Sequence, residues 1–430
     1  MKKYKFQVFT AFLFFVCFSI GGCSRPTAET TVLADPLHSL SADASDPKLS
    51  AALKVIEKNP DAVQPYLALA GIYIAKARRT GDFGLNANAE NAVERGLKVG
   101  PNDFTARKLK ASLDLTYHRF AEALELGTQL QKENPSDAFV YGVLTDANVE
   151  LGNYDTAVEM AQKMVDLRPN SASYARVAHI RSLNGDQKGA VEMFKLAART
   201  ADPSDYEAQS WCLVQLGDEL WKYGKYAEAE AVYDEALQML PDYYLAAIGK
   251  GRARASQNDL PSAVDILTKT SDRIPNVEAF AQLGDIYSKL GDAEKAKQNY
   301  ATVEVVEAKI GVNNDQKRLA LMWANNGERL DDALAIAVRE HGLRRDINTA
   351  DTLAWTLFKL GRYAEARPVI AEALRLRSNE ARILYHSGMI EKALGNASTA
   401  KQQLSQALKL NPEFDLIQSD VARKALSEYK

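Results

Sequence analysis

The chain has 430 residues, of which 46% are hydrophobic and 25% are charged, and its formal net charge is −3. This composition is typical of a folded globular protein and lacks the strongly basic balance of a nucleic-acid-binding domain. Two of the three cysteines lie within the first 23 residues, so Cys212 has no second cysteine in the rest of the chain with which to form a disulfide.

Residues 1–22 are typical of a bacterial signal peptide. Three lysines precede the apolar run 8–20, which is too short to span the ~30 Å hydrocarbon core of a membrane as a helix. The sequence IGGC that ends at Cys23 resembles the bacterial lipobox, in which the cysteine is lipidated and the leader is cut before it. The resemblance implies stable anchoring through Cys23 by several acyl chains. Two alternatives stay open: a plain secretory leader, and an uncleaved signal anchor.

Residues 23–46 are predicted to form a flexible tether. They are small, polar and punctuated by proline, and they show no helical periodicity. Ser24, rather than aspartate, follows the lipidated position. By the sorting habit of Gram-negative lipoproteins, serine there would direct the protein to the outer membrane. We therefore expect a lipid-anchored protein of the cell envelope, at the outer membrane if the host is Gram-negative.

An internal repeat covers residues 47–414. Alanines recur at spacings of 33 to 39 residues, a glycine stands five residues before seven of them, and a proline stands twelve residues after six. The ten alanines are Ala89, Ala123, Ala157, Ala190, Ala229, Ala263, Ala296, Ala333, Ala366 and Ala400. Three residue types in one frame indicate that each unit is one helix–turn–helix hairpin.

The marked positions have structural reasons. The glycine lies between the two helices, where a left-handed backbone ends the first helix without steric cost. The alanine, and small residues of the first helix such as Gly217 and Gly284, let the two helices approach closely. The proline stops the second helix. The turn glycines of the frame are Gly84, Gly152, Gly185, Gly224, Gly291, Gly361 and Gly395.

The frame resembles the tetratricopeptide repeat, whose pattern is W-x₂-L-G-x₂-Y…A-x₃-F…P. The segment from Phe280 to Tyr300 matches it closely, and so does the segment from Leu213 to Pro241. The resemblance implies an all-α fold, an α-solenoid of about ten hairpins wound into a right-handed superhelix. Single hairpins cannot bury their apolar faces alone, so neighbouring repeats must stack.

Three stretches depart from the frame, around residues 76–88, 202–208 and 311–345. The first two carry extra residues, and the third has Glu328 at the glycine position and no closing proline. A helix around residues 48–58 is predicted to cap the N-terminal end of the array. Residues 415–430 are predicted to form a capping helix at the other end.

No catalytic constellation is recognisable in the sequence. It contains no P-loop, no G-x-S-x-G elbow, no H-E-x-x-H and no C-x-x-C, and its five histidines are scattered without metal-ligand spacing. The repeats occupy the mature chain and leave no room for a catalytic domain. We therefore expect a protein that is not an enzyme and needs neither cofactor nor metal.

The resemblance also implies where a partner binds. In tetratricopeptide proteins the first helix of each hairpin lines the concave face, and aromatic and arginine side chains are the usual hot spots of interfaces. The candidate groove residues are Trp211, Trp221, Arg252, Arg318, Trp355, Phe358, Arg382 and Tyr385. The alternative for any single tryptophan is that it packs into the superhelix.

The function implied is a membrane-anchored scaffold that docks segments of protein partners in the concave groove, with a role in cell-envelope assembly. One alternative is a glycan- or nutrient-binding surface lipoprotein, because one outer-membrane sugar-capture family is built on a similar helical core. In that case aromatic side chains would stack on sugars. Nucleic acid is not expected as a partner.

Overall fold

The computed structural model describes residues 46–310 and 316–429. The chain divides into two compact units, residues 1–46 and 47–430, and the description below concerns the second unit. The predicted signal peptide, the lipidation site Cys23 and nearly all of the predicted tether lie outside the described residues.

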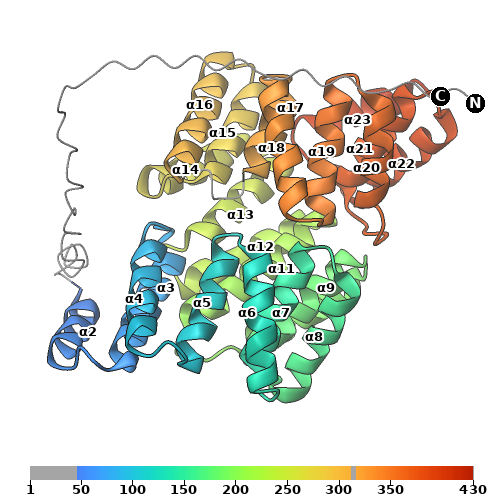
Figure 1. Cartoon of the computed structure of the whole chain (residues 1–430). Helices are drawn as coiled ribbons and strands as arrows, with labels where there is room; N and C mark the ends of the chain where they lie inside the picture. The colour runs from blue at the N-terminus through green and yellow to red at the C-terminus, as the bar shows by residue number, and fades with distance from the viewer. Residues whose placement is uncertain (1–45, 311–315, 430) are drawn as a thin grey trace, which may run out of the picture. The chain divides into compact units, whose positions relative to one another are not determined.

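Every regular element in the described residues is an α-helix, and consecutive helices pair into ten hairpins, α3–α4 to α21–α22, with α2 and α23 at the ends (Figure 1). This confirms the predicted all-α solenoid. The helices are α2 (Pro47–Lys58), α3 (Val63–Thr80), α4 (Leu85–Val99), α5 (Phe104–Thr116), α6 (Phe120–Glu133), α7 (Ala138–Glu150), α8 (Tyr154–Leu167), α9 (Ser171–Leu183), α10 (Gln187–Thr200), α11 (Tyr206–Lys222), α12 (Tyr226–Met239), α13 (Tyr244–Ser256), α14 (Leu260–Arg273), α15 (Val277–Lys289), α16 (Ala293–Ile310), α17 (Lys317–Asn326), α18 (Leu330–Leu343), α19 (Ile347–Lys359), α20 (Tyr363–Ala373), α21 (Ala381–Ala393), α22 (Ala397–Leu410) and α23 (Gln418–Ser427). Odd-numbered helices from α3 to α21 are the first helices of their hairpins.

The repeat alanines lie at the contact between the two helices of each hairpin. All ten are at most 5% exposed. Glycines of the first helix receive the aromatic ring of the second. A Cβ on Gly217 would lie 2.4 Å from Cε1 of Tyr233, and one on Gly284 would lie 2.4 Å from Cε1 of Tyr300. Small side chains are therefore required at these positions, as close helix packing demands.

Six of the seven frame glycines adopt a left-handed backbone between the helices of their hairpins: Gly152, Gly185, Gly224, Gly291, Gly361 and Gly395, with φ from 72° to 80°. The expectation for the seventh, Gly84, is wrong. Its φ is −59°, and it precedes α4 as the N-cap, whereas Gly81, with φ 72°, ends α3. The reason is that the extra residues around 76–88 lengthen α3 to 18 residues, which moves the turn along the chain.

The irregular eighth hairpin also places its turn differently from the frame. Its first helix, α17, has only 10 residues and ends at Gly327, whose φ is 71°. The repeat frame placed the turn glycine at position 328, which is Glu328. The glycine that forms the turn stands one residue earlier. Arg329 follows with φ 45° and precedes α18. The chain thus needs two left-handed residues to complete this turn.

The superhelix returns on itself, because hairpin tips contact linkers about 190 residues further along the chain. The α7–α8 tip meets the α18–α19 linker, where Arg344 pairs with Glu150 at 3.0 Å and the Ile347 N–H donates to the Tyr154 hydroxyl at 2.9 Å. The α11–α12 tip meets the α22–α23 linker, where the Tyr226 hydroxyl donates to Asn411. Each such tip touches the linker that follows the hairpin five places later. These contacts border the space between the first helices.

Among the described residues, no helix combines the length and the apolar character needed to cross a bilayer.

Candidate partner-binding cavity

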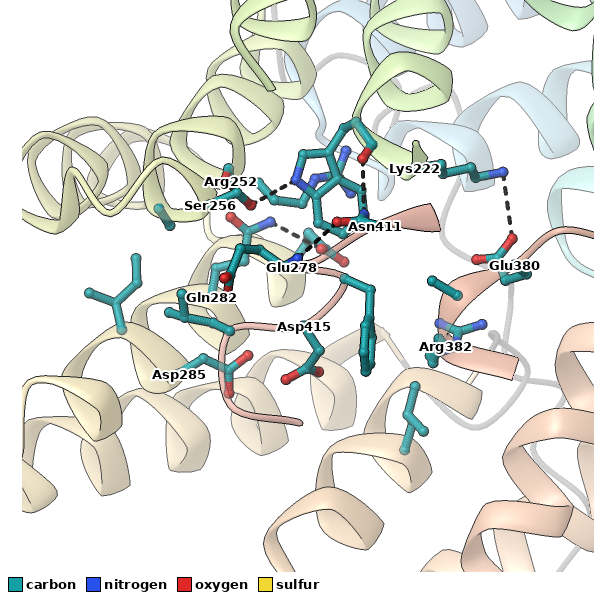
Figure 2. Close-up of a pocket in the computed structure, with 18 residues that line it drawn as sticks. Lys222, Arg252, Ser256, Glu278, Gln282, Asp285, Glu380, Arg382, Asn411 and Asp415 are labelled. Atoms are coloured by element: carbon teal, nitrogen blue, oxygen red, sulfur yellow. Dashed lines mark hydrogen bonds and ion pairs between the residues drawn. The ribbon is translucent and has the colours of Figure 1, made fainter. Parts of the chain in front are cut away.

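Two adjoining hollows lie between the first helices, with volumes of about 220 Å³ and about 410 Å³. We call them together the inner cavity. Nearly all helical residues that line it come from first helices, from α9 to α21, and the α22–α23 linker lies along one side. Figure 2 draws the residues that line the smaller hollow. The residues that line both hollows are Trp221, Lys222, Arg252, Glu278, Asp285, Leu321, Glu380, Arg382 and Asp415.

Four of the eight predicted groove residues line this cavity. Trp221, Arg252 and Arg382 line both hollows, and Arg318 lines the larger one. They come from α11, α13, α21 and α17, so residues far apart in the sequence converge on one space. The structure thereby brings together the basic members of the predicted set.

The other four do not line the cavity. Trp355 and Tyr385 are each 1% exposed, which corrects the expectation that they present their rings to a partner. Trp355 is stacked between Phe358, at a centroid distance of 4.8 Å, and His386, at 4.1 Å. Trp211 is partly buried and packs in the core with α9 to α13.

The physical reason is the C-terminal cap. The α22–α23 linker and α23 cover the last hairpins, with Phe414 in the same core as Trp355 and Tyr385. The polar atoms of Trp355 and Tyr385 form hydrogen bonds within the protein. The Trp355 Nε1–H donates to Asn325 at 2.8 Å, and the Tyr385 hydroxyl donates to Gln418 at 2.7 Å. These aromatic side chains therefore stabilise the cap.

The indole of Trp221 is only partly available. The guanidinium of Arg252 lies over its ring, 4.2 Å from the centroid, and the indole N–H donates to Ser256 at 2.9 Å. A cation over an indole face is a favourable arrangement that fixes both side chains. Trp221 is thus a rigid wall of the cavity.

Ion pairs connect consecutive first helices along the inner surface. In each, an arginine reaches back to a carboxylate of the preceding first helix. The pairs are Arg176 with Asp146 (2.6 Å), Arg252 with Asp218, Arg318 with Glu278 (3.0 Å) and Arg382 with Asp351 (3.1 Å). The pairs of Arg176, Arg252 and Arg382 are partly buried, so salt screens them less than exposed pairs and they hold neighbouring repeats in register.

Lys222 adds a further positive charge next to two carboxylates. Its Nζ lies 3.8 Å from Glu219 and 3.9 Å from Glu380. Burial disfavours its charged form, but the two carboxylates outweigh burial and raise the pKa of Lys222. His179 lines the larger hollow nearby.

The acidic side of the cavity is different in character. Figure 2 shows Asp285, Gln282 and Asp415 on one side and Lys222, Glu380 and Arg382 on the other. The Tyr300 hydroxyl donates to Asp285 at 2.7 Å. Burial, and then the charge of Asp415, raise the pKa of Asp285 to about 8. This carboxyl therefore binds its proton at neutral pH unless a cation approaches.

Sequence reasoning missed the acidic members of the cavity that lie outside the predicted set. Glu278 lies on α15, and Glu380 and Asp415 belong to linkers between helices, where the repeat pattern carries no positional rule. The only signal in the sequence for an acidic side of the cavity was the presence of acidic residues in the first helices. Within the described residues, no group of His, Cys, Asp and Glu side chains is arranged to hold a metal ion.

Comparison with known proteins identifies the repeats. One tetratricopeptide repeat model matches residues 214–276 and 352–413, and another matches residues 277–303. The resemblance to this repeat is thereby confirmed. Tetratricopeptide proteins are in general non-enzymatic scaffolds that bind protein partners.

Individual relatives are distant. Anaphase-promoting complex subunit 3 of Schizosaccharomyces pombe is 25% identical over 206 residues, which are 46% of this chain and 29% of that protein. This chain thus matches less than a third of the relative's length. The structure of the APC/C hetero-tetramer Cut9–Hcn1 has a TM-score of 0.48 at 17% identity and covers 91% of this chain and 70% of its own. The human IFIT1 dimer with PPP-AAAA has a TM-score of 0.47 at 15% identity and covers 89% of this chain and 91% of its own.

Proposed function

We propose that this array of tetratricopeptide repeats is a membrane-anchored scaffold of the cell envelope, which docks a segment of a protein partner in the inner cavity. The observation that carries the proposal is the convergence of Trp221, Arg252, Arg318 and Arg382 from four separate first helices on one hollow. Aromatic and arginine side chains fixed in such a hollow are the usual anchors of a protein interface.

The glycan-binding alternative has less support. Stacking on sugar rings requires aromatic faces that are free, and the indole of Trp221 is covered on one face by Arg252. The ring of Trp355 is buried between two other rings. The inner cavity instead offers charged groups, which suit peptide side chains.

Photo-crosslinking tests where the partner docks. We expect a photoreactive phenylalanine analogue at position 318 to form adducts with a defined partner in the native host, because the Arg318 side chain lines the cavity and is 58% exposed. The same analogue at position 269 is the control. Lys269 lies on the second helix α14, and its side chain is 74% exposed and does not line the cavity. The measurement is mass spectrometry of the adducts.

Equal adducts from both positions would show that the cavity has no special part in docking. Adducts from position 269 alone would place the interface on the outer surface and contradict the proposal.

Lipid anchoring rests on the lipobox resemblance at Cys23. We expect the mature protein to lack residues 1–22 and to carry the mass of a lipid on Cys23, measured by mass spectrometry of the membrane fraction. Cys23→Ser should remove the added mass and release the protein from the membrane fraction, because serine cannot form the thioether. Cys17→Ser, in the predicted leader, is the control and should leave lipidation intact. A wild-type protein of unmodified mass in the soluble fraction would contradict anchoring.

A further inference from the structure

Three aspartates of the inner surface occupy the same place in their repeats. Asp146, Asp218 and Asp285 each stand eleven residues before the repeat alanine, on α7, α11 and α15. The equivalence extends to a neighbour. The Tyr233 hydroxyl donates to Asp218 at 2.7 Å, and the Tyr300 hydroxyl donates to Asp285 at 2.7 Å. Asp218 and Asp285 thus have the same local setting.

The first two aspartates have an arginine partner. Arg176 forms two hydrogen bonds to Asp146, at 2.9 Å and 2.6 Å, and Arg252 pairs with Asp218. Both arginines come from the first helix of the following hairpin. Such a guanidinium neutralises a carboxylate that would otherwise be costly to keep ionised away from bulk water.

Asp285 has no such partner among the described residues. The arginine of the following first helix, Arg318, pairs instead with Glu278, two turns earlier on α15, at 3.0 Å. Across residues 46–310 and 316–429, no lysine or arginine lies within ion-pair distance of the Asp285 carboxyl. Within the part of the chain that the structure describes, the one hydrogen-bond partner of this carboxyl is the Tyr300 hydroxyl. The series of ion pairs is therefore incomplete at this position.

The surroundings of Asp285 offer further acceptors to a cation. Asp415 faces it from the α22–α23 linker (Figure 2). The Asp415 Oδ1 accepts the N–H groups of Ile417 and Gln418 at 2.9 Å and 2.7 Å. The Oε1 of Gln282, one turn before Asp285, is buried and receives no hydrogen bond from the described residues. A lysine ammonium has three donors and an arginine guanidinium has five, and neither has an acceptor.

The hollow has room for one such side chain. Its volume of about 220 Å³ is below the ~300–1,000 Å³ of typical ligand sites, which favours a single side chain over a whole small molecule. Trp221, Leu321 and Phe414 contribute apolar wall. Long basic side chains bury their methylene stem against such a wall while the charged end reaches polar groups.

We infer that the smaller hollow of the inner cavity takes a lysine or arginine side chain of the protein partner, and that Asp285, with Asp415 and Gln282, receives its charge. This rests on the proposed function and specifies the chemistry of the docked segment. The bound cation completes the ion pair that the other aspartates of the series form within the chain.

Protonation gives the inference a second signature. Asp285 faces Tyr300 on α16, Asp415 on the linker and Glu278 on its own helix. With its pKa at about 8, Asp285 is mostly protonated at pH 7. A bound cation favours the carboxylate and lowers this pKa, so binding releases a proton. Affinity for the cation therefore rises as the pH increases toward 8 and levels off above it.

The test compares three blocked pentapeptides, acetyl-Gly-Ser-X-Ser-Gly-amide with lysine, norleucine or glutamate at X, by ligand-observed NMR and calorimetry on the full mature chain. We expect the lysine peptide alone to bind. Asp285→Asn should weaken it at least tenfold at pH 8 and abolish proton release, because asparagine keeps the hydrogen bond from Tyr300 but not the charge. Asp265→Asn is the control, since Asp265 is 59% exposed on α14 and pairs with Lys269 outside the cavity.

Equal binding of the glutamate or norleucine peptide, or full binding of the lysine peptide to Asp285→Asn, would overturn the inference. Crosslinking from position 318 distinguishes a failure of this inference from a failure of the proposed function. Adducts that persist at full yield in Asp285→Asn leave docking in place and remove the cationic anchor. Adducts that Asp285→Asn abolishes, with the variant still folded, support the anchor. If the chain that carries the analogue at position 318 and has no other substitution forms no adducts, the docking step itself fails.

Discussion

Arg344→Ala should destabilise the folded chain by about 3–5 kcal/mol, because it removes a buried guanidinium and leaves Glu150 without its ion-pair partner and Glu340 with Arg339 alone. The Arg344 side chain is 2% exposed and pairs with Glu340 on α18 and with Glu150 at the end of α7, each at 3.0 Å. The pair with Glu150 connects two hairpins through residues that are 194 positions apart in the sequence. The measurement is urea unfolding followed by circular dichroism at pH 7.

The matched control is Arg339→Ala. Arg339 pairs with the same Glu340 at 3.0 Å, but it is 40% exposed and, among the described residues, forms no ion pair or hydrogen bond with α7, so its loss should cost less than about 1 kcal/mol. Burial raises the pKa of Glu150, so the effect of Arg344→Ala should shrink as the pH falls and that carboxyl takes up a proton. Similar effects of the two substitutions would show that the contact between hairpin tip and linker contributes little to stability.

Gly152→Ala should cost about 2–4 kcal/mol, more than the same substitution at an equivalent glycine. Gly152 has φ 75° at the end of α7, and an added Cβ would lie 2.4 Å from the carbonyl oxygen of Arg345 in the α18–α19 linker. Both backbone strain and a steric clash with a distant segment therefore oppose alanine. The measurement is the change in unfolding free energy.

Gly395→Ala isolates the effect of backbone strain from that of the steric clash. Gly395 has φ 79° in the same place of the last hairpin, and nothing lies within 4 Å of an added Cβ. It should cost only the ~1–2 kcal/mol of a left-handed alanine. Equal losses of unfolding free energy for the two substitutions would mean that the hairpin tip and the linker move apart to accommodate the added Cβ without a free-energy cost.

The sequence carried strong information about the hairpins, because their contacts are local. The alanine and the turn glycine interact with residues of the same hairpin or the next, so a fixed spacing reports them directly. Gly84 and Glu328 show the limit of this reasoning. Where a helix is lengthened, as in α3, or shortened, as in α17, the turn moves to a neighbouring glycine, Gly81 or Gly327. The frame alone does not determine helix length.

The candidate site was only partly predictable. Frame position correctly indicates which residues belong to first helices, and it selected Arg252, Arg318 and Arg382. It also selected Trp355 and Tyr385, which the cap buries. Whether a residue of a first helix faces a cavity or a core depends on what covers it. Here the covering residues come from the α22–α23 linker and α23, which have no place in the repeat.

The sequence by itself thus determined the hairpin and its repetition, since the spacing of alanine and glycine acts over a few helical turns. Only the tertiary structure decided which charges meet. Arg344 reaches Glu150 across 194 residues, and Arg318 pairs with Glu278 rather than with Asp285. Small rotations between successive hairpins add up along a superhelix, and their sum fixes which distant segments touch. No local pattern encodes that sum, so the inner cavity and the aspartate that lacks an ion-pair partner among the described residues appear only in the folded chain.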